Sequence, residues 1–597
     1  MATQEAIFIR GFAAGNRTAG GNRNGTTGAG ATSESDRPAG FRPPKLADDA
    51  TADRAMVPPM TLRWLTFPGL MATMLTADAV AAADGAALYA KHCAMCHQAT
   101  GAGLPGVFPP LAGSDFVKNE RSRAIRAVCE GLSGPIKVNG KDYNSAMPLV
   151  VLSDAEASAV LSHVFSSWGN EEKPVTAAEV AEERARTKFP TYAKLVAAQS
   201  YAPLPSPPEG WALREVGQLP ISPTRLLHRA GDATVLMLEL NGNVWRFDPA
   251  TGVSELALPA STYIDPALGG PMTMGMAWDR DGRFYVVANQ RNEKKTPITN
   301  EVTVFRTKPG QSPAGIAEPA PWFRTGYPWG IGGFNHGLTH MAQGPDGMLH
   351  LSSGSRTDGN EPGGDARLSK EGEVPVSGCL WRLDPAAETP ELEVFCRGLR
   401  NPYGFCWTPD GRLWATDNGP DADAPEELNW LREGRHYGFP YRFSDWAEKP
   451  YPHTPKAPDG LELTDPVVNL GPQAGFEAKP GALSTFSPHS SPAGLVWLES
   501  DVYPAPFRHS FLVTRFGNLL KKERDTGFDL VRVSAVSVGE NRLAAEVHTV
   551  LAPLARPIDI VEWKPGTLLI AEYGRATTFE GGLGQPGRML ELSVTAK

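Results

Sequence analysis

Two cysteines and a histidine indicate a chemistry that the sequence alone can name. Cys93, Cys96 and His97 form a CxxCH motif in the run CAMCH. Two thiols at this spacing can add to the vinyl groups of a haem, and the next residue then becomes an iron ligand. A zinc site would need a second ligand pair at a suitable spacing, which the neighbouring sequence lacks. The motif therefore predicts a covalently bound haem c and electron transfer.

A low-spin haem iron needs a second axial ligand, and we expect Met147 to supply it. Met147 lies 50 residues after His97 in the loop YNSAMPLVVLSD. A thioether ligand raises the reduction potential of the haem, as an electron acceptor requires. Met95 lies inside the motif and points the wrong way, and His163 falls on a predicted helix where a packing or surface role is expected. His97 and Met147 are therefore the predicted iron ligands.

These residues lie in a segment that has the pattern of a small all-α domain, residues 84–170. We expect one short amphipathic helix over Gly85 to His92 and another over Ser153 to Trp168, with Ser153 as N-cap and Glu156 completing a capping box. Pro- and Gly-rich loops are expected between them. With the runs FPPLAGSDF and SWGN, about 85 residues resemble the cytochrome c domains that serve periplasmic alcohol and sugar dehydrogenases.

From about Trp211 to the end, short apolar runs alternate with Gly, Pro, Asn and Asp turns, which predicts an all-β domain over residues 211–597. An Asp-Gly turn before a strand recurs at Asp281, Asp346 and Asp410, with spacings of 65 and 64 residues. A second element recurs as NVWRFD, GCLWRLD and, more loosely, GRMLELS. About six repeats of this length fit the region, so we expect a six-bladed β-propeller rather than a sandwich with fortuitous turns.

The rest of the chain suggests export and a linker. Residues 60–83 read as a signal peptide, with an apolar stretch from about Leu65 to Val80 followed by small residues. Residues 1–59 show no helical or strand period and are expected to be disordered or to precede the true start, at Met56 or Met60; the alternative is a cytoplasmic arm and a membrane anchor. No later segment is expected to span a bilayer. Residues 171–210 are the expected linker, with a charged helical stretch AAEVAEERARTKF followed by the Pro-rich run PLPSPPEG.

Charge and cysteine usage are compatible with an exported protein. A net charge of -9 over 597 residues argues against nucleic acid as a partner. Export permits disulfides, and Cys379 and Cys396 could face each other in a hairpin about Pro385 to Glu388. Buried free thiols are the alternative for these two and for Cys129 and Cys406, since sequence cannot settle connectivity.

The run from Gly398 to Pro440, GLRNPYGFCWTPDGRLWATDNGPDADAPEELNWLREGRHYGFP, resembles the soluble quinoprotein glucose, aldose sugar and sorbosone dehydrogenases. The resemblance implies a six-bladed propeller that binds pyrroloquinoline quinone (PQQ) and calcium. It also implies that His336, in GGFNHGLTHMAQGPDG, is the catalytic general base, with His340 as the fallback. Such a base suits the chemistry, because a hydroxyl must lose its proton while hydride leaves the same carbon for a quinone carbonyl.

The same resemblance implies the residues that hold the cofactors. Arg400 and Asn401 match a quinone-contacting pair, although an Arg-Asn before proline could instead lock a turn. Gly419 and Pro420 match positions whose carbonyls hold the quinone's calcium. Glu426 and Glu427 match a second, structural calcium region, with a solvated acidic turn as the alternative.

Three further cofactor-facing residues follow from the resemblance: Arg515, Arg556 and His489, with a satisfied polar residue at a strand start as the alternative for His489. One departure is Asn335, where the glucose-oxidising members have an aspartate before the catalytic histidine. A carboxylate would raise the basicity of His336, whereas an amide can only orient it. The family's glutamine-bearing loop has no clear counterpart in GGPMTMGMAWD.

Together these features predict a periplasmic or otherwise exported dehydrogenase that oxidises a sugar-like alcohol or aldehyde. It would pass electrons to its own haem and then to an external cytochrome or oxidase. One alternative is a propeller without quinone that binds glycans or protein. A hydrolase is a third class, against which the absence of a further carboxylate or His cluster counts. The substrate itself does not follow from the sequence, since pocket loops vary freely on one fold.

Overall fold

The computed structural model describes residues 84–103, 108–132, 134–144, 147, 150–187, 189–191, 201–310, 316–330, 335–364, 366–444, 451–472, 484–519, 526–538, 542–575, 577 and 586–595. The predicted signal peptide (60–83) and the extension before it lie outside these residues. Within them, no helix is long and apolar enough to cross a membrane.

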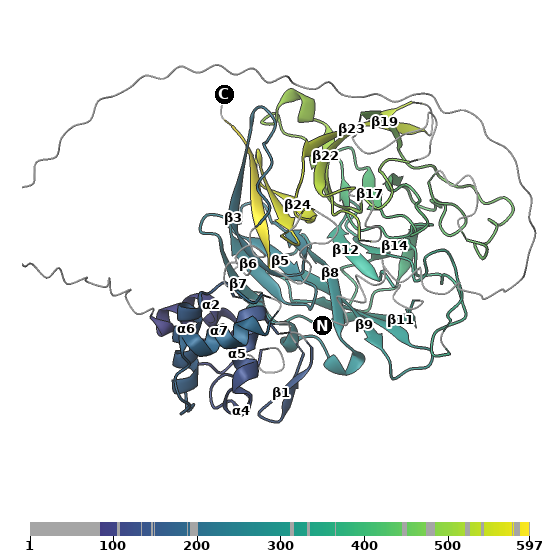
Figure 1. Cartoon of the computed structure of the whole chain (residues 1–597). Helices are drawn as coiled ribbons and strands as arrows, with labels where there is room; N and C mark the ends of the chain where they lie inside the picture. Colours follow the sequence, from purple (N-terminus) through teal and green to yellow (C-terminus); the bar gives the residue numbers. More distant parts are fainter. Residues whose placement is uncertain are drawn as a thin grey trace, which may run out of the picture. The chain divides into compact units, whose positions relative to one another are not determined.

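The N-terminal part of the described chain is a small helical domain (Figure 1). Both predicted helices are confirmed, because α2 spans Gly85–His92 and α6 spans Asp154–Ser166 with Ser153 and Glu156 forming the capping box. The other elements are α3 (Ala94–His97), α4 (Asp115–Asn119), α5 (Arg121–Glu130), the hairpin β1 (Ile136–Val138) and β2 (Lys141–Tyr143), and α7 (Ala177–Ala185).

Two of these elements differ from the expectation of loops. α4 and α5 lie where only Pro- and Gly-rich loops were expected, and α5 buries an apolar face that includes Ile125 and Cys129. α7 confirms the helical stretch expected in residues 171–210, and it packs against α5 and α6. Arg184 on α7 is buried and donates to Asp154 at 2.6 Å. The physical cause is tertiary, since these short helices are stabilised by packing an apolar face rather than by propensity.

The remaining strands form six antiparallel sheets, one per propeller blade, which confirms the predicted fold. The first four blades comprise β4 (Pro223–Leu227), β5 (Val235–Glu239), β6 (Val244–Asp248) and β7 (Val253–Leu258); β8 (Pro271–Trp278), β9 (Phe284–Asn292), β10 (Thr299–Arg306) and β11 (Ala320–Pro328); β12 (Leu338–Gln343), β13 (Leu349–Ser353), β14 (Cys379–Leu383) and β15 (Glu393–Arg397); and β16 (Phe405–Trp407), β17 (Leu413–Asp417) and β18 (Glu427–Leu431).

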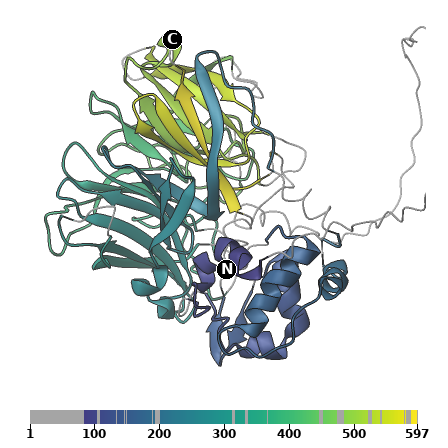
Figure 2. The same cartoon turned by 90° about the vertical axis from the view of Figure 1, so that its left-hand side faces the viewer.

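The last two blades depart from the simple antiparallel order of the others. The fifth contains β20 (Pro492–Leu498), β21 (Ser510–Arg515), β22 (Asp529–Ser537) and β23 (Leu543–Leu551), with β19 (Val468–Pro472) added parallel to β23. The sixth contains β24 (Pro557–Lys564), β25 (Thr567–Glu572), β26 (Pro586–Val594) and β3 (Trp211–Ile221). β3 pairs with β26, and Figure 2 shows this long blue strand beside the yellow C-terminal strands. Pairing the two ends of the domain within one blade closes the ring of blades.

The sequence repeat corresponds to the blade. Asp281, Asp346 and Asp410 each lie in the turn between the first and second strands of a blade. The second repeated element falls on the third strand, as β6, β14 and β26. The cysteines on β14 and β15 are free and buried, because the register pairs Cys379 with Arg397 and Cys396 with Leu380.

A buried arginine connects the inner strands of the ring. Arg225 on β4 donates to the carbonyls of Met274, Thr339 and Tyr403 at 3.1, 2.8 and 2.8 Å, which belong to or adjoin β8, β12 and β16. It also forms an ion pair with Asp559 on β24 at 3.3 Å. Asp559 in turn accepts the Leu226 amide at 2.8 Å. One side chain thus contacts five of the six blades.

We expect Arg225→Met to lower the free energy of unfolding by about 3–5 kcal/mol, because Asp559 would be left buried without its partner. Arg412→Met is the matched control, since Arg412 pairs with Asp410 at the surface with 46% and 55% of the side chains exposed; its loss should cost less than about 1 kcal/mol. Denaturant unfolding followed by tryptophan fluorescence measures both. Equal, small losses would show that Arg225 does not hold the ring together.

Candidate functional site

In the helical domain, the predicted haem ligands line one apolar cavity. The cavity is bordered by Cys93, His97 and Met147 and by apolar side chains that include Leu111, Phe116, Val160 and Phe165. The Nδ1 of His97 donates to the carbonyl of Pro109 at 3.0 Å, which directs Nε2 to the other side of the ring. Burial lowers the pKa of His97, so that the imidazole is neutral, as an iron ligand must be. The residues therefore fit a haem held between His97 and Met147.

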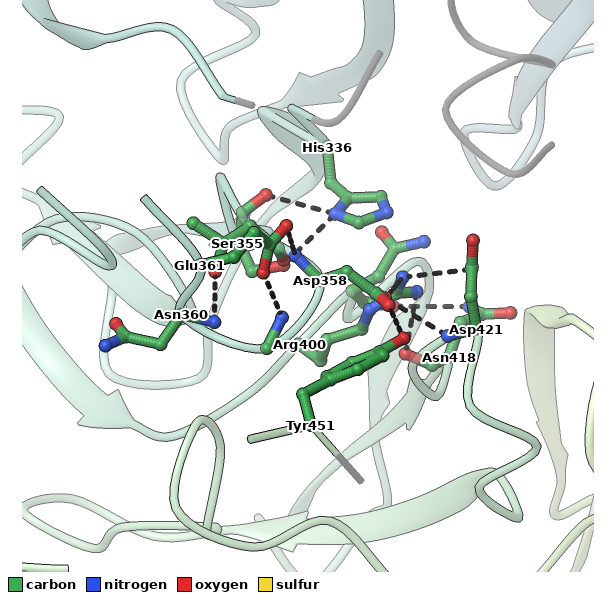
Figure 3. A network of polar contacts seen from close by, with 12 residues as sticks. His336, Ser355, Asp358, Asn360, Glu361, Arg400, Asn418, Asp421 and Tyr451 are labelled. Carbon is green, nitrogen blue, oxygen red and sulfur yellow. Dashed lines mark hydrogen bonds and ion pairs between the residues drawn. The ribbon is translucent and has the colours of Figure 1, made fainter. Parts of the chain in front are cut away.

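In the propeller, the residues before β12 and after β13 position His336. His336 is buried, and its Nδ1 contacts the carbonyl and hydroxyl of Ser355 at 3.0 and 3.2 Å (Figure 3). Because the carbonyl can only accept, Nδ1 carries the proton and Nε2 is the basic nitrogen. Burial, followed by the charge of Arg400, holds the pKa of His336 well below its ordinary value near 6.5. The side chain is thus a neutral, oriented base.

The amide of Asn335, beside this histidine, is buried and lacks internal partners. Neither Oδ1 nor Nδ2 of Asn335 finds a hydrogen-bond partner among the described residues, and the same holds for Oδ1 of Asn401. Buried amides are nearly always satisfied, and each exception requires an explanation. A polar ligand in contact with both amides would provide it.

Arg400 is fully buried at the centre of a network of carboxylates (Figure 3). It donates to Asp358 Oδ1 at 2.6 Å and lies 3.6 Å from Asp421. Asp358 also accepts the Asp421 amide at 3.1 Å and the hydroxyl of Tyr451. The network thus brings two carboxyl groups and one guanidinium together in a buried site.

The backbone around Arg400 and Asn401 is fixed by Asp417, the last residue of β17. Its carboxylate accepts the amides of Arg400 at 3.0 Å and of Asn401 at 2.6 Å. Burial, together with the nearby Glu427, raises the pKa of Asp417 well above its ordinary value. The turn predicted as the alternative for Arg-Asn-Pro is therefore real, and it places both side chains at the site.

Glu426 and Glu427 in the acidic loop do not converge on one site, as the predicted structural calcium region would require. Glu426 accepts Ser490 Oγ at 2.9 Å and the Ser491 amide at 2.6 Å, whereas Glu427 accepts the Ser444 amide at 2.7 Å. The two consecutive side chains thus face different loops. Burial raises the pKa of Glu426 to about 8 and that of Glu427 to about 7. Among the described residues, no three His, Cys, Asp or Glu side chains converge as a metal cluster.

The three remaining predicted residues lie on neighbouring loops but are bound differently. His489 contacts Asp423 at 2.6 Å through Nε2. Arg515 forms a two-pronged ion pair with Asp529 at 2.7 and 2.5 Å, which neutralises its charge. Arg556 is fully buried, with its guanidinium over the rings of Phe516 and Phe528. Of these three residues, Arg515 is linked to the site through Glu426, because the charges of both Arg400 and Arg515 act on the pKa of Glu426.

His340, the fallback base, does not join this site. Its Nδ1 accepts the amide of Phe405 at 3.0 Å, and the ring lines a cavity of about 460 Å³ with Arg225 and Asp559. That cavity includes residues toward the far ends of the inner strands, such as Trp407 and Glu562. His336, which precedes β12, is therefore the histidine that faces Arg400.

The sequence did not indicate three residues of the network: Ser355, Asp358 and Tyr451. Ser355 and Asp358 lie in the run SSGSRTDGN directly after β13, where polar residues at a strand end would have been a usable signal. Tyr451 lies 93 residues from Asp358, and no local pattern connects them.

Comparisons with known proteins agree with both domains. Residues 227–516 match the family described as Glucose / Sorbosone dehydrogenase, and residues 82–168 match the cytochrome c family. Cytochrome c-552 of Thermus thermophilus is 43% identical over 132 residues, which cover 20% of this chain and 88% of that protein.

The propeller has more distant relatives. Quinoprotein glucose dehydrogenase B of Acinetobacter calcoaceticus is 21% identical over 225 residues, covering 33% of this chain and 46% of that protein. The PQQ-bound aldose sugar dehydrogenase of Streptomyces coelicolor aligns with 20% identity and a TM-score of 0.42, covering 65% of this chain and all of that one.

The lowered pKa of His336 predicts a pH dependence of stability. The unfolded imidazole binds a proton below about pH 6.5 while the folded one does not, so stability is complete above that pH and is lost as the pH falls toward the lowered pKa. Between pH 7.5 and 5.5 we expect the wild type to lose about 1 kcal/mol more unfolding free energy than His336→Gln. Denaturant titrations at both pH values measure the difference; parallel losses would show that His336 titrates normally.

Proposed function

The chain belongs to the glucose/sorbosone dehydrogenase family and carries its own cytochrome c domain, and we propose that it oxidises a sugar-like alcohol or aldehyde with PQQ and calcium and passes the electrons to its haem. The main observation behind this proposal is that His336, a neutral buried base, lies at the same end of the propeller as Arg400 and two side-chain amides with polar atoms that are unsatisfied among the described residues. A ligand-binding role without chemistry would not need a histidine whose proton is placed on Nδ1 and whose pKa is lowered.

The residues present fit the quinone. PQQ carries carboxylates and an ortho-quinone, and a guanidinium fork such as that of Arg400 matches both. Asn401 Oδ1 and the amide of Asn335 supply a buried acceptor and donor that are unsatisfied among the described residues. When bound, PQQ supplies the electron-poor carbonyl that takes hydride from the substrate carbon.

His336 would remove the proton from the substrate hydroxyl. Its Nε2 is the basic nitrogen because Ser355 holds the proton at Nδ1. The substrate thereby loses one proton from oxygen and one hydride from carbon, which converts an alcohol to a carbonyl or a cyclic hemiacetal to a lactone. Ser355 offers a carbonyl and a hydroxyl rather than a carboxylate, so it orients His336 without raising its pKa strongly.

Calcium is supported by the type of donor rather than by a ligand cluster. Asp358 and Asp421 both face Arg400, and Asp421 directly follows Gly419 and Pro420, whose carbonyls are the ligands expected from the resemblance. Carbonyl and carboxylate oxygens are the donors that suit calcium. We place this ion at the Gly419–Pro420 loop, and the separate environments of Glu426 and Glu427 make a shared second site less favourable.

The haem would collect the electrons. Oxidation of one substrate molecule releases two electrons, whereas one haem iron takes one at a time, so two ferric-to-ferrous reductions and two re-oxidations by an external cytochrome or oxidase balance each turnover. We place the protein outside the cytoplasm, on the strength of the apolar segment in residues 60–83 and its small residues.

Reconstitution tests the proposal. PQQ and calcium are added to the purified haem-loaded protein, and ferrous haem absorbance is followed with a panel of aldoses, aldehydes and alcohols. We expect reduction that requires both additions and that falls at least about 100-fold in His336→Ala, because the proton acceptor is gone. His340→Gln is the matched control, since its amide can still accept the Phe405 N–H. Failure of PQQ to bind would leave a binding module in place of an enzyme.

The axial ligand can be tested separately. Met147→His replaces the thioether by an imidazole, and we expect the haem reduction potential to fall by on the order of 100 mV. Spectroelectrochemical titration measures it, with Met348→His, a half-buried methionine of the propeller, as control. An unchanged potential would exclude Met147 as an iron ligand.

A further inference from the structure

Tyr201, where the described chain resumes after the helical domain, is held between two arginines. The guanidinium carbons of Arg575 and Arg588 lie 4.4 and 5.0 Å from the centre of its ring. Its hydroxyl donates to the carbonyl of Gly587 at 3.0 Å, with that of Pro586 at 3.3 Å. Aromatic contacts with cations that are largely removed from water are among the stronger surface attachments.

The attachment continues along the chain and has a rigid base. The amide of Ala202 donates to the carbonyl of Arg575 at 3.1 Å, and Leu204 packs against the apolar core of the fifth and sixth blades. Arg575 Nε donates to Pro586 at 3.0 Å, and Arg588 is paired with the buried Glu572. We call Tyr201, Ala202 and Leu204 with these two arginines the Tyr201 clamp.

The clamp lies at the end of the propeller that carries the site. The Tyr573 amide donates to the carbonyl of Arg556 at 2.9 Å, and the Tyr573 ring contacts Phe516 edge-on at 5.4 Å. Arg575 follows two residues later. The other end of the blade is marked by Trp211, because β3 pairs Trp211 with Val594 and Ile221 with Pro586. The chain therefore attaches beside the site before it runs the length of the blade.

Chain length gives this attachment a consequence. Ten peptide steps separate Thr191, the last described residue before this segment, from Tyr201, and a fully extended chain spans at most about 35 Å over that length. Without the clamp, the first strand-paired residue is Trp211, twenty steps from Thr191, and the reach doubles to about 70 Å. The clamp thus halves the length of chain between the helical domain and its first attachment to the propeller. It also places that attachment at the end of the propeller that carries the candidate site.

We propose that the Tyr201 clamp is a tether anchor that raises the local concentration of the haem domain at the quinone end of the propeller and so accelerates intramolecular electron transfer. The inference rests on the proposed function. In each transfer one electron leaves the reduced propeller and converts ferric to ferrous haem; two transfers and the release of two protons to solvent complete the turnover. The effective concentration of the haem domain falls as about the −3/2 power of tether length for a flexible chain, and as the cube of the reach if the domain explores the whole accessible volume. Doubling the reach therefore lowers it by roughly 3-fold in the first case and roughly 8-fold in the second.

The test compares two rates in full-length protein loaded with haem, PQQ and calcium. Stopped-flow absorbance gives the rate of haem reduction after mixing with the substrate found by reconstitution, and a soluble redox dye gives turnover that bypasses the haem. In Tyr201→Ala/Leu204→Ser we expect haem reduction to slow by about 3- to 8-fold with dye turnover unchanged. Tyr441→Ala, which removes a ring stacked on His436 elsewhere in the propeller, is the matched control and should leave both rates unchanged.

A second variant inserts ten Gly/Ser residues after Thr191 and leaves the clamp intact. It should slow haem reduction by a similar factor. If the double variant does not fold, this insertion variant tests whether tether length controls the rate. Haem reduction at the wild-type rate in a folded double variant would overturn the clamp as an anchor, and so would a wild-type rate in the insertion variant. If the wild type itself shows no dye turnover, the proposed function fails first and the tether role fails with it.

Discussion

The propeller depends on the charge of Arg225 at its axis. Six sheets arranged around a channel turn backbone carbonyls of their inner strands toward a space that little water reaches, and buried polar groups require partners. Arg225 donates to three of these carbonyls and to Asp559, so one guanidinium satisfies groups from four other blades. The ring is also closed at its rim by β3 and β26. Because the site residues lie at or just before the leading ends of inner strands, the same cross-links fix their spacing.

Burial then sets the chemistry of the site. It removes the charge from His336, and it raises the pKa values of Asp417, Glu426 and Glu427, so the acidic loop is less anionic than its sequence suggests. Arg400, Asp358 and Asp421 meet in one buried network near His336. A neutral base beside a fixed cation is the arrangement on which the proposed quinone chemistry rests.

The two domains have separate hydrophobic cores and separate chemistry. The length of the chain between them limits how far apart they can lie. The helical domain continues through α7, whose packing leaves only a short segment before Tyr201. Residues hundreds of positions apart in sequence, such as Tyr201 and Arg588, meet because the ring closes N-terminal and C-terminal strands in one blade. The attachment of the linker is thus a consequence of how the fold closes.

The sequence by itself determined the features that are local or periodic. The CxxCH spacing, the capped helix after Ser153, the Asp-Gly turns one blade apart and the Arg-Asn-Pro turn are each encoded within a few residues, and the structure has the two helices, the six blades and the turn. Ligation by His97 and Met147 remains a prediction that their common cavity supports. The short helices α4 and α5 were missed because only packing stabilises them.

Only the tertiary structure decided which side chains act on one another. Ser355 reaches His336 from 19 positions away, Asp358 reaches Arg400 from 42, and Tyr451 reaches Asp358 from 93. It also separated His340 from His336, although four positions separate them in sequence, and it divided Glu426 from Glu427 between two loops. These outcomes depend on which loops the closed ring brings together, and loop juxtaposition is set by the packing of whole blades rather than by any local pattern of residues.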